Sequence, residues 1–556
     1  MGLADYIVLF GYFVFITAFG IWISRKIKSS DGYFRGERKF KWWLMIGQAF
    51  GVGTHAEMPV AQTGATYSHG FATIWYQWKN MLITPFYWLI APFYRRSERT
   101  TVGEIVEDRY GRGMGMVYSV FAITFFVFCM GVMLQGAAKV ISVASGNLIS
   151  PNMVVFFMTV AFLLYSFIGG IVAAAYTDFV QSFLIIALSV MLIPLGLKEI
   201  GGFSGMRSVL PENFFDLINA DSGIDAFTIA MLALNGVVGI TAQPHMVTMC
   251  ATGNTERAGR IGQTFGSLVK RLVTIGWALT GLVTATLVVK NNTSLPDQEM
   301  AFGYACRELL YPGLIGLMLA AIVSANMSSC SNFMTNTGAL FTQNFYKKYI
   351  NPAASDRQLL WMGRFSGLGL SLLAVLFALS VKNVLHAFLF TETLAAFMGI
   401  MFLGGILWKR ANRYGAAAAV ISSFVVYYLV NAIDTGQVML VYKWKPGPFG
   451  LAMLAGFFFF WLVSILTKPE KRENIEAFFD NMRRKSDASY SDADGKKPLA
   501  EKTGDDLLLL DLPGWLKKDR WKNFFRRYRE DLVGFFLSWM VVGLLILIAW
   551  AIMQIR

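Results

Sequence analysis

Ionisable side chains inside apolar stretches are the first chemical signal in this chain. They include His55 and Glu57, which precede a proline, and Lys79 and Glu392 in two other stretches. Such groups are costly at membrane depth, so they usually face a pathway for polar solutes or an oppositely charged partner. We expect these four residues to contact a solute or a proton, since a histidine can change charge near neutral pH. The alternative is that Lys79 forms a structural ion pair with Glu57.

Two apolar stretches are also interrupted by residues that break helices. Residues 47–59 contain three glycines and Pro59, and residues 235–245 combine Asn235, two glycines and Pro244. A membrane helix that unwinds frees carbonyl groups and helix ends, which are tolerated only where they line a cavity. We therefore predict that both stretches are broken helices, each the first helix of one of two inverted five-helix repeats. For any single glycine, the alternative is close helix packing.

The composition places the chain in a membrane. Of its 556 residues, 55% are hydrophobic and 15% are charged, and the mean hydropathy is +0.50. These values are too apolar for a soluble domain, and the chain is too long for a single span. The net charge of +14 does not indicate nucleic acid, because the basic residues stand at the ends of apolar stretches, as cytoplasmic anchoring requires. The cysteines and histidines are scattered, so neither a disulfide framework nor a metal cluster is expected.

Apolar runs of about 20 residues predict about fourteen membrane-spanning helices and an all-α polytopic fold. The expected spans are residues 6–23, 42–62, 71–94, 117–143, 153–172, 179–197, 226–250, 273–289, 313–341, 365–381, 385–408, 415–432, 449–466 and 532–553. Residues 1–467 are expected to form a thirteen-helix transporter region, with an inverted-repeat core at about 42–408. Residues 468–531 then form a cytoplasmic polar linker, disordered in its middle and amphipathic at its end, and residues 532–556 hold the final helix.

Basic residues predict the orientation of these helices. They gather in loops such as those at Arg25, Arg95 and Lys409, whereas the alternate loops at 144–152 and 201–225 contain fewer of them. Basic loops are usually cytoplasmic, which places both termini outside. The amino terminus lacks the positive region of a signal peptide, so the first helix should remain as a span. We therefore expect an integral protein of the plasma (inner) membrane, with the lipid bilayer as its surroundings.

Several longer motifs match a known family. The most specific motifs cover residues 169–181 and 402–416, and supporting motifs lie at 101–111, 243–245 and 320–348. Through these motifs, roughly residues 5–470 resemble the sodium:solute symporter family, which includes sodium/glucose, proline, pantothenate and sialic acid transporters. The resemblance implies a leucine-transporter-like fold, alternating access, and symport of a small solute with Na+ as the coupling ion and no other cofactor.

The resemblance also implies a sodium site between the helices at 42–62 and 313–341. By position, its ligands are the carbonyls of Gly51, Thr54 and Ala321 and the hydroxyl of Ser324. The family usually has a second hydroxyl residue at the next position, where this sequence has Ala325, so one oxygen ligand is missing. Ser328, Ser329 or a water molecule are the candidates to replace it.

Ion coupling has one further candidate residue. Asp178 matches a family aspartate associated with sodium release, and the alternative is a helix-start carboxylate favoured by the helix dipole. If sodium binds poorly, the alternative function is a proton-coupled or ion-independent carrier on the same fold. A membrane-embedded sensor is a more distant alternative. An enzyme is not expected, because the sequence shows no nucleophile with a base, no metal cluster and no paired catalytic carboxylates at usable spacing.

The solute site implied by the resemblance faces the central cavity. Its residues are Met58, Gln77, Asn80, Asn235 and Phe388. Sugar carriers of the family have polar, often acidic groups at the first two positions, so Met58 and Gln77 argue against a hexose. Since His55 and Lys79 are both available, we expect a solute that bears a carboxylate.

Overall fold

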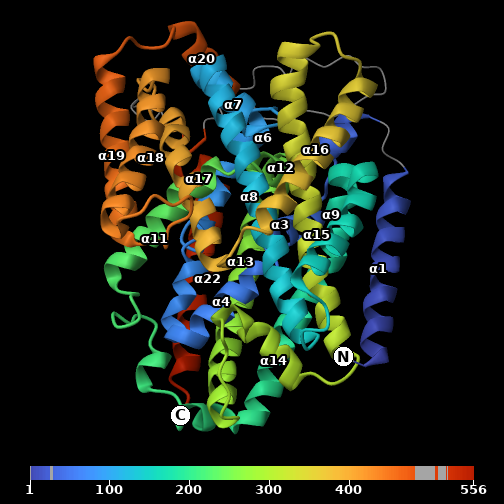
Figure 1. Ribbon diagram of the computed structural model, residues 1–556. Helices are drawn as coiled ribbons and strands as arrows, with labels where there is room; N and C mark the ends of the chain where they lie inside the picture. The colour runs from blue at the N-terminus through green and yellow to red at the C-terminus, as the bar shows by residue number, and fades with distance from the viewer. Residues whose placement is uncertain (1, 26–28, 483–507, 511–520, 522–523) are drawn as a thin grey trace.

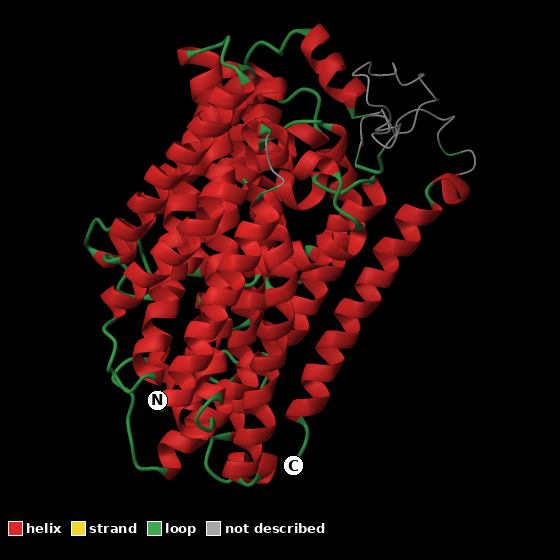
Figure 2. Ribbon diagram, turned by 90° about the vertical axis from the view of Figure 1, so that its right-hand side faces the viewer, coloured by secondary structure: helices red, strands yellow, loops and turns green. Residues whose placement is uncertain are grey.

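The fold is a bundle of helices that run between two ends of the molecule (Figure 1, Figure 2). The computed structural model describes residues 2–25, 29–482, 508–510, 521 and 524–556, and among these it contains no β-strand. The first part of the chain forms α1 (Leu3–Ser24), α2 (Ser30–Arg35), η1 (Gly36–Arg38), α3 (Trp42–Gly53), α4 (Glu57–His69), η2 (Phe71–Ile74), α5 (Trp75–Trp78), α6 (Thr84–Arg96), α7 (Val102–Tyr110), α8 (Arg112–Ala144) and α9 (Pro151–Ile200).

The second part of the chain continues the bundle and adds helices at its edge. Its elements are α10 (Gly202–Arg207), η3 (Glu212–Phe215), α11 (Ala226–Gly239), η4 (Ile240–Ala242), α12 (Met246–Ala251), α13 (Glu256–Lys290), η5 (Gln298–Met300), α14 (Ala301–Leu309), α15 (Leu314–Leu340), the π-helix η6 (Phe341–Ile350), α16 (Asp356–Ala378), α17 (Val384–Leu407), α18 (Arg413–Thr435), α19 (Pro446–Leu466), α20 (Arg472–Asn481), α21 (Phe524–Arg527) and α22 (Arg529–Met553).

Nine helices in the described part of the chain are long and apolar enough to cross a membrane. They coincide with nine of the predicted spans. The remaining predicted spans lie on helices that break or kink inside the bundle, so their unbroken pieces are shorter. The all-α polytopic fold predicted from the apolar runs is therefore confirmed.

Two predicted spans, 153–172 and 179–197, are joined in α9 through a kink at Gly170. There φ is 51° and ψ is −144°, a conformation that favours glycine because it has no Cβ. A Cβ on Gly170 would lie 2.5 Å from the carbonyl oxygen of Tyr33. The glycine thus permits both the kink and the contact with α2, and it leaves Asp178 on the second half of α9.

The helix predicted at 273–289 is longer than expected. α13 runs from Glu256 to Lys290, so Lys270 and Arg271 lie inside it, with only 6% and 3% of their surfaces exposed. Both side chains donate hydrogen bonds to backbone carbonyls of neighbouring segments, which replace the water they would otherwise need. The predicted start was wrong because charges beside an apolar run normally mark a membrane boundary.

Both predicted helix breaks are present. The first lies between Gly53 at the end of α3 and Glu57 at the start of α4. The second lies between Ala242 at the end of η4 and Met246 at the start of α12, and it contains Pro244, which has no N–H to continue a helix. α13 packs against α3 and α4, and α17 packs against α11 and η4, so each break is enclosed by other helices.

The predicted linker at 468–531 begins with a helix that packs on the bundle. The rings of Phe478 and Phe479 on α20 are buried, and the guanidinium of Arg109 on α7 lies 5.9 Å from each ring centroid. Arg96 at the end of α6 donates to the carbonyl of Met482 at 3.1 Å. The start of this segment is therefore part of the folded transporter region.

The remainder of the linker is described only in part. The stretch predicted as disordered and most of the predicted amphipathic segment lie outside the described residues. α21 leads into α22, which begins at Arg529, slightly before the predicted start at 532. The two chain ends lie at the same end of the bundle (Figure 1), as the predicted orientation requires.

Candidate transport site

The two helix breaks meet at a cavity in the centre of the bundle. The first break contributes His55 and Glu57 to its lining, and the second contributes Gln243 and His245. Further side chains of the wall come from several other helices, including α8, α13 and α17. The cavity has a volume of about 50 Å³, which holds a few water molecules but is well below the volume usual for an organic ligand. The site is therefore in a closed form.

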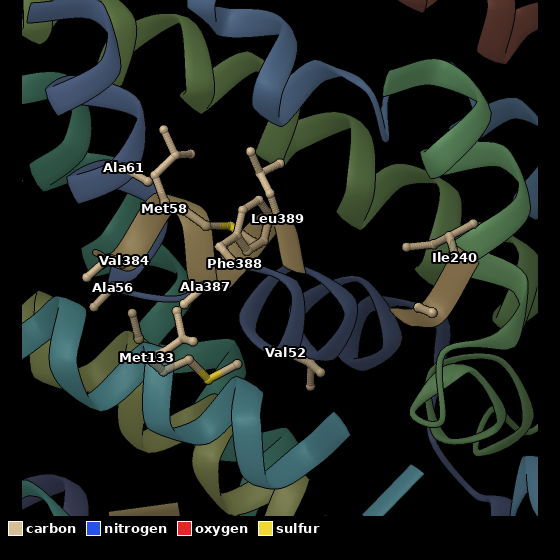
Figure 3. Close-up of a cluster of buried hydrophobic side chains, with 14 of the residues drawn as sticks. Val52, Ala56, Met58, Ala61, Met133, Ile240, Val384, Ala387, Phe388 and Leu389 are labelled. Carbon is tan, nitrogen blue, oxygen red and sulfur yellow. The ribbon is translucent and has the colours of Figure 1, made fainter. Parts of the chain in front are cut away.

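Apolar side chains form part of the cavity wall. Met58 and Phe388, two of the predicted solute contacts, line it together with Met133 and Ile240. Figure 3 shows the sulfur of Met58 against the ring of Phe388. α4 and α17 thus bring two residues together that are far apart in the sequence.

A network of hydrogen bonds surrounds Glu392 at the edge of the cavity. Lys79 Nζ donates to Glu392 Oε2 at 2.7 Å and to Asn235 Oδ1 at 3.1 Å. Asn80 Nδ2 donates to the same carboxylate oxygen at 3.4 Å, and Gln243 Nε2 donates to Oε1 at 3.0 Å. Asn80 lines the cavity, whereas Asn235 reaches the site through Lys79, whose side chain is fully buried. These bonds stabilise a buried ion pair that links α5, α11 and α17.

Glu57 pairs with His55 and not with Lys79. Its Oε1 lies 2.6 Å from Nδ1 of His55, whose Nε2 lies 2.6 Å from the carbonyl oxygen of Val52. The predicted alternative, in which Lys79 pairs with Glu57, is therefore wrong. The helix break folds His55 back onto Glu57, while the Lys79 amine faces α11 and α17 and is neutralised by Glu392.

Two cations that the sequence reasoning missed also line the cavity. Lys270 Nζ donates to the carbonyl of Gly53 at the end of α3, and Arg271 Nη1 donates to the carbonyl of Gln77 at 2.7 Å. Gln77, a predicted solute contact, is buried but is not among the residues that line the cavity. Neither cation forms an ion pair within the described residues. Lys270 and Arg271 are the only charged residues in the sequence from 261 to 289. A predicted helix that covered this whole range would have placed both of them inside the membrane.

Oxygen atoms gather beside the first break. The carbonyl of Gly51 accepts a hydrogen bond from Ser329 Oγ at 3.2 Å. A Cβ on Gly51 would lie 2.8 Å from the Cβ of Asp178 and 3.1 Å from the Oγ of Ser328. Asp178 is fully buried and accepts a hydrogen bond from Asn332 Nδ2 at 2.9 Å. The absent side chain at Gly51 thus lets a carboxylate and a hydroxyl approach the backbone of the broken helix.

Other predicted sodium ligands line a second, smaller cavity next to this cluster. Thr54 and Ala321 both line it, together with Ala325. The side chain of Ser324 lies outside the described part of the structure. The end of α3 and the middle of α15 therefore bring these predicted positions together around one cavity.

Residues 33–422 match the model of the sodium:solute symporter family. This range holds both helix breaks and every residue that lines the central cavity. The chain belongs to the sodium:solute symporter family. As a member, it is a secondary transporter rather than an enzyme. It is 25% identical over 487 residues to the osmoregulated proline transporter OpuE of Bacillus subtilis (strain 168), with 84% of this chain and 96% of that relative covered.

Another similar family member is the sodium/sialic acid symporter NanT of Aliivibrio fischeri (strain ATCC 700601 / ES114). It is 25% identical over 497 residues, which cover 86% of this transporter and 95% of the relative. The solved structure of a Na+-coupled sialic acid symporter in a substrate-bound outward-open state has a TM-score of 0.71 at 20% identity, covering 85% of this chain and 99% of that chain. The predicted family and the leucine-transporter-like fold with its inverted repeat are confirmed.

Proposed function

We propose that this transporter uses the downhill movement of Na+ to take up a small organic solute that bears a carboxylate. The observation that carries the proposal is the closed cavity between two helix breaks, lined by Lys270 and Arg271. Glu392 is paired with Lys79, and Glu57 is paired with His55. The remaining positive charge attracts an anionic group, and both side chains donate strong hydrogen bonds to carboxylates.

The oxygen cluster beside the first break supports Na+ as the coupling ion. Gly51, Asp178 and Ser328 are in close contact there, and Thr54 follows at the break itself. Unwound backbone and buried oxygen atoms are the usual means of binding Na+ inside a membrane. One monovalent ion that crosses 100 mV releases about 2.3 kcal/mol, which permits roughly fifty-fold accumulation of a solute.

The size of the cavity supports alternating access. A volume of about 50 Å³ leaves no room for a whole organic solute. The helices around it must therefore separate towards one end of the bundle for entry and towards the other for release. The ends of the broken helices are placed to respond to ligands, because residues of both breaks line the cavity.

We place the protein in the plasma (inner) membrane with both termini outside. Support comes from the position of the two termini at one end of the bundle (Figure 1) and from the basic residues at the end of α6 and at the start of α13. A single cysteine introduced at Gly2 should react with an impermeant maleimide added to intact cells. Reaction only after the cells are permeabilised would reverse the orientation.

Uptake into proteoliposomes tests the function. We expect a small carboxylate or amino acid to accumulate under an inward Na+ gradient and not when choline replaces Na+. Accumulation driven by a pH gradient without Na+ would select the proton-coupled alternative, and equal uptake in choline would select an ion-independent carrier. A screen of carboxylates, amino acids, nucleosides and sugars for thermal stabilisation, with and without Na+, supplies the solute for this measurement.

A further inference from the structure

The smaller cavity beside the first break has an unusual lining. It has a volume of about 20 Å³ and is bordered by Thr54 at the break, Trp277 of α13, and Ala321 and Ala325 of α15. The two alanines are four residues apart, so they lie on the same face of α15. Thr54 and Ala321 are also expected sodium ligands, and this cavity therefore adjoins the proposed cation site.

Two of the residues that line this cavity, Thr54 and Trp277, each have a buried polar side-chain atom without a hydrogen-bond partner among the residues described. Thr54 Oγ1 and Trp277 Nε1 have no hydrogen-bond partner in the described part of the chain, and the two residues are 1% and 0% exposed. A buried donor or acceptor without a partner costs about 1–3 kcal/mol. Native proteins usually satisfy such groups with an ordered water molecule where the space allows it.

The volume and the polar atoms together fit one water molecule. A cavity of about 10–15 Å³ or more is sufficient for one water, which needs two to four polar partners. The N–H of Trp277 can only donate, so the water oxygen accepts from it with one lone pair. One water hydrogen is then directed to Thr54 Oγ1, and the second lone pair remains for a cation.

We propose that a water molecule in this cavity is a ligand of the transported Na+, held by Trp277 and Thr54 in the space beside Ala325. The inference rests on the proposed sodium coupling and deepens it. The water would supply the oxygen ligand that the family's hydroxyl residue provides at the position of Ala325. Trp277 acts as a positioning residue, since it touches the water and not the ion.

Substitutions at Ala325 test the proposal directly. Purified protein is titrated with Na+ by isothermal calorimetry without solute, so the readout is binding and not transport. Ala325→Ser supplies the oxygen itself and spares the ordering of a water, so the Na+ Kd should fall by about threefold or more. The side chain introduced by Ala325→Cys is nearly as small as that of Ala325→Ser and would also displace the water. Its soft sulfur is a poor ligand for a hard cation, so the Na+ Kd should rise by about tenfold.

A substitution at Trp277 provides an independent test. Trp277→Phe removes the N–H that holds the water, and loss of one such hydrogen bond should raise the Na+ Kd by about three- to tenfold. In the Ala325→Ser background the water is replaced, so the same substitution should change the Kd by less than about twofold. Trp444→Phe is the matched control, because Trp444 Nε1 is also buried without a partner among the described residues but belongs to the α18–α19 connection.

The outcomes separate this inference from the proposed function. If the wild-type protein shows no Na+ binding, sodium coupling itself is wrong. If the wild type binds Na+ but Ala325→Ser and Ala325→Cys shift the Kd in the same direction, the water ligand is overturned. The same conclusion holds if the Trp277→Phe effect persists in the Ala325→Ser background or is matched by Trp444→Phe.

Discussion

The two helix breaks occupy equivalent positions in their repeats, yet their surroundings differ. The first break adjoins Gly51, Asp178 and Ser328 and is rich in oxygen acceptors. The second break presents the amide of Gln243, which donates to Glu392 at 3.0 Å. Acceptors suit a cation, whereas donors beside a buried ion pair suit an organic solute. A repeated fold can therefore divide ion and solute binding between its two halves.

The backbone carbonyl groups at the two helix breaks have different hydrogen-bond partners. At the second break the carbonyls of Thr241 and Ala242 accept hydrogen bonds from the hydroxyls of Tyr94 and Tyr118. Each of these two carbonyl groups therefore has a neutral hydroxyl as its partner. At the first break the carbonyl of Gly53 accepts from Lys270 Nζ of α13, so its partner is an amine and not a hydroxyl. The oxygen cluster at Gly51 supports our proposal that the ion binds at the first break, and the Gln243–Glu392 contact makes the second break the candidate for the solute.

The largest expected effect comes from removing the carboxylate beside the second break. Glu392→Gln leaves Lys79 buried without its counter-charge, and breaking a buried ion pair costs about 3–5 kcal/mol. We expect uptake to fall by about a hundredfold or more and the Tm of the purified protein to decrease. The double variant Lys79→Met with Glu392→Gln removes both charges and should recover most of the Tm but not the uptake. Wild-type uptake by Glu392→Gln would mean that the second break does not bind the solute.

A smaller but selective effect is expected at the first break. Asp178→Asn keeps the shape of the side chain and removes its charge, and polar contacts to a charged group, judged from hydrogen bonds, contribute about 1.5–3 kcal/mol. The Na+ concentration for half-maximal uptake should therefore rise by about tenfold or more. The solute KM at saturating Na+ should change by less than about twofold. Ser371→Ala, which removes a buried hydroxyl from α16 outside both sites, is the control. If the solute KM rises by as large a factor as the Na+ concentration for half-maximal uptake, the two breaks do not bind the ion and the solute separately.

A substitution of Gln243 tests whether the second break affects the solute KM alone. Gln243→Ala removes one hydrogen bond to the Glu392 carboxylate, so the solute KM should rise by about tenfold at most. The Na+ dependence should stay unchanged, because the side-chain amide of Gln243 donates to Glu392 and not to the oxygen cluster at Gly51. Gln437→Ala, in an exposed loop, should alter neither quantity. Equal shifts in Na+ and solute dependence would show that the two breaks act as one site.

The two helix breaks could be predicted from the sequence because unwound membrane helices contain glycine, proline and polar residues. Three glycines and a proline in residues 47–59, and a proline between polar residues in 235–245, cannot continue an ordinary membrane helix. Met58, Asn80 and Phe388, which were taken from family positions, also line the cavity. These features depend on local residue types, which a single sequence contains.

The partners of the buried charges were not predictable in the same way. Lys79 and Glu392 are 313 positions apart, and their contact depends on the rotation of α5 against α17, which one sequence does not encode in any local pattern. Lys270 and Arg271 were excluded because charges next to an apolar run usually lie at the membrane surface. Only the packing of α3 and α5 on α13, with their free carbonyls, makes burial of these cations possible.

The smallest expected effect is at Lys270, where the two halves meet. Its ammonium contacts the end of α3 and also lines the solute cavity. Lys270→Gln keeps a donor but removes the charge, and since Arg271 remains, the KM of a carboxylate solute should rise by only about fivefold. The amide analogue of the same solute should show an unchanged KM, and Lys347→Gln, an exposed cation on η6, should affect neither. If the acid and the amide shift equally, Lys270 supports the end of α3 only, and the charge of the solute is recognised by another group in the cavity.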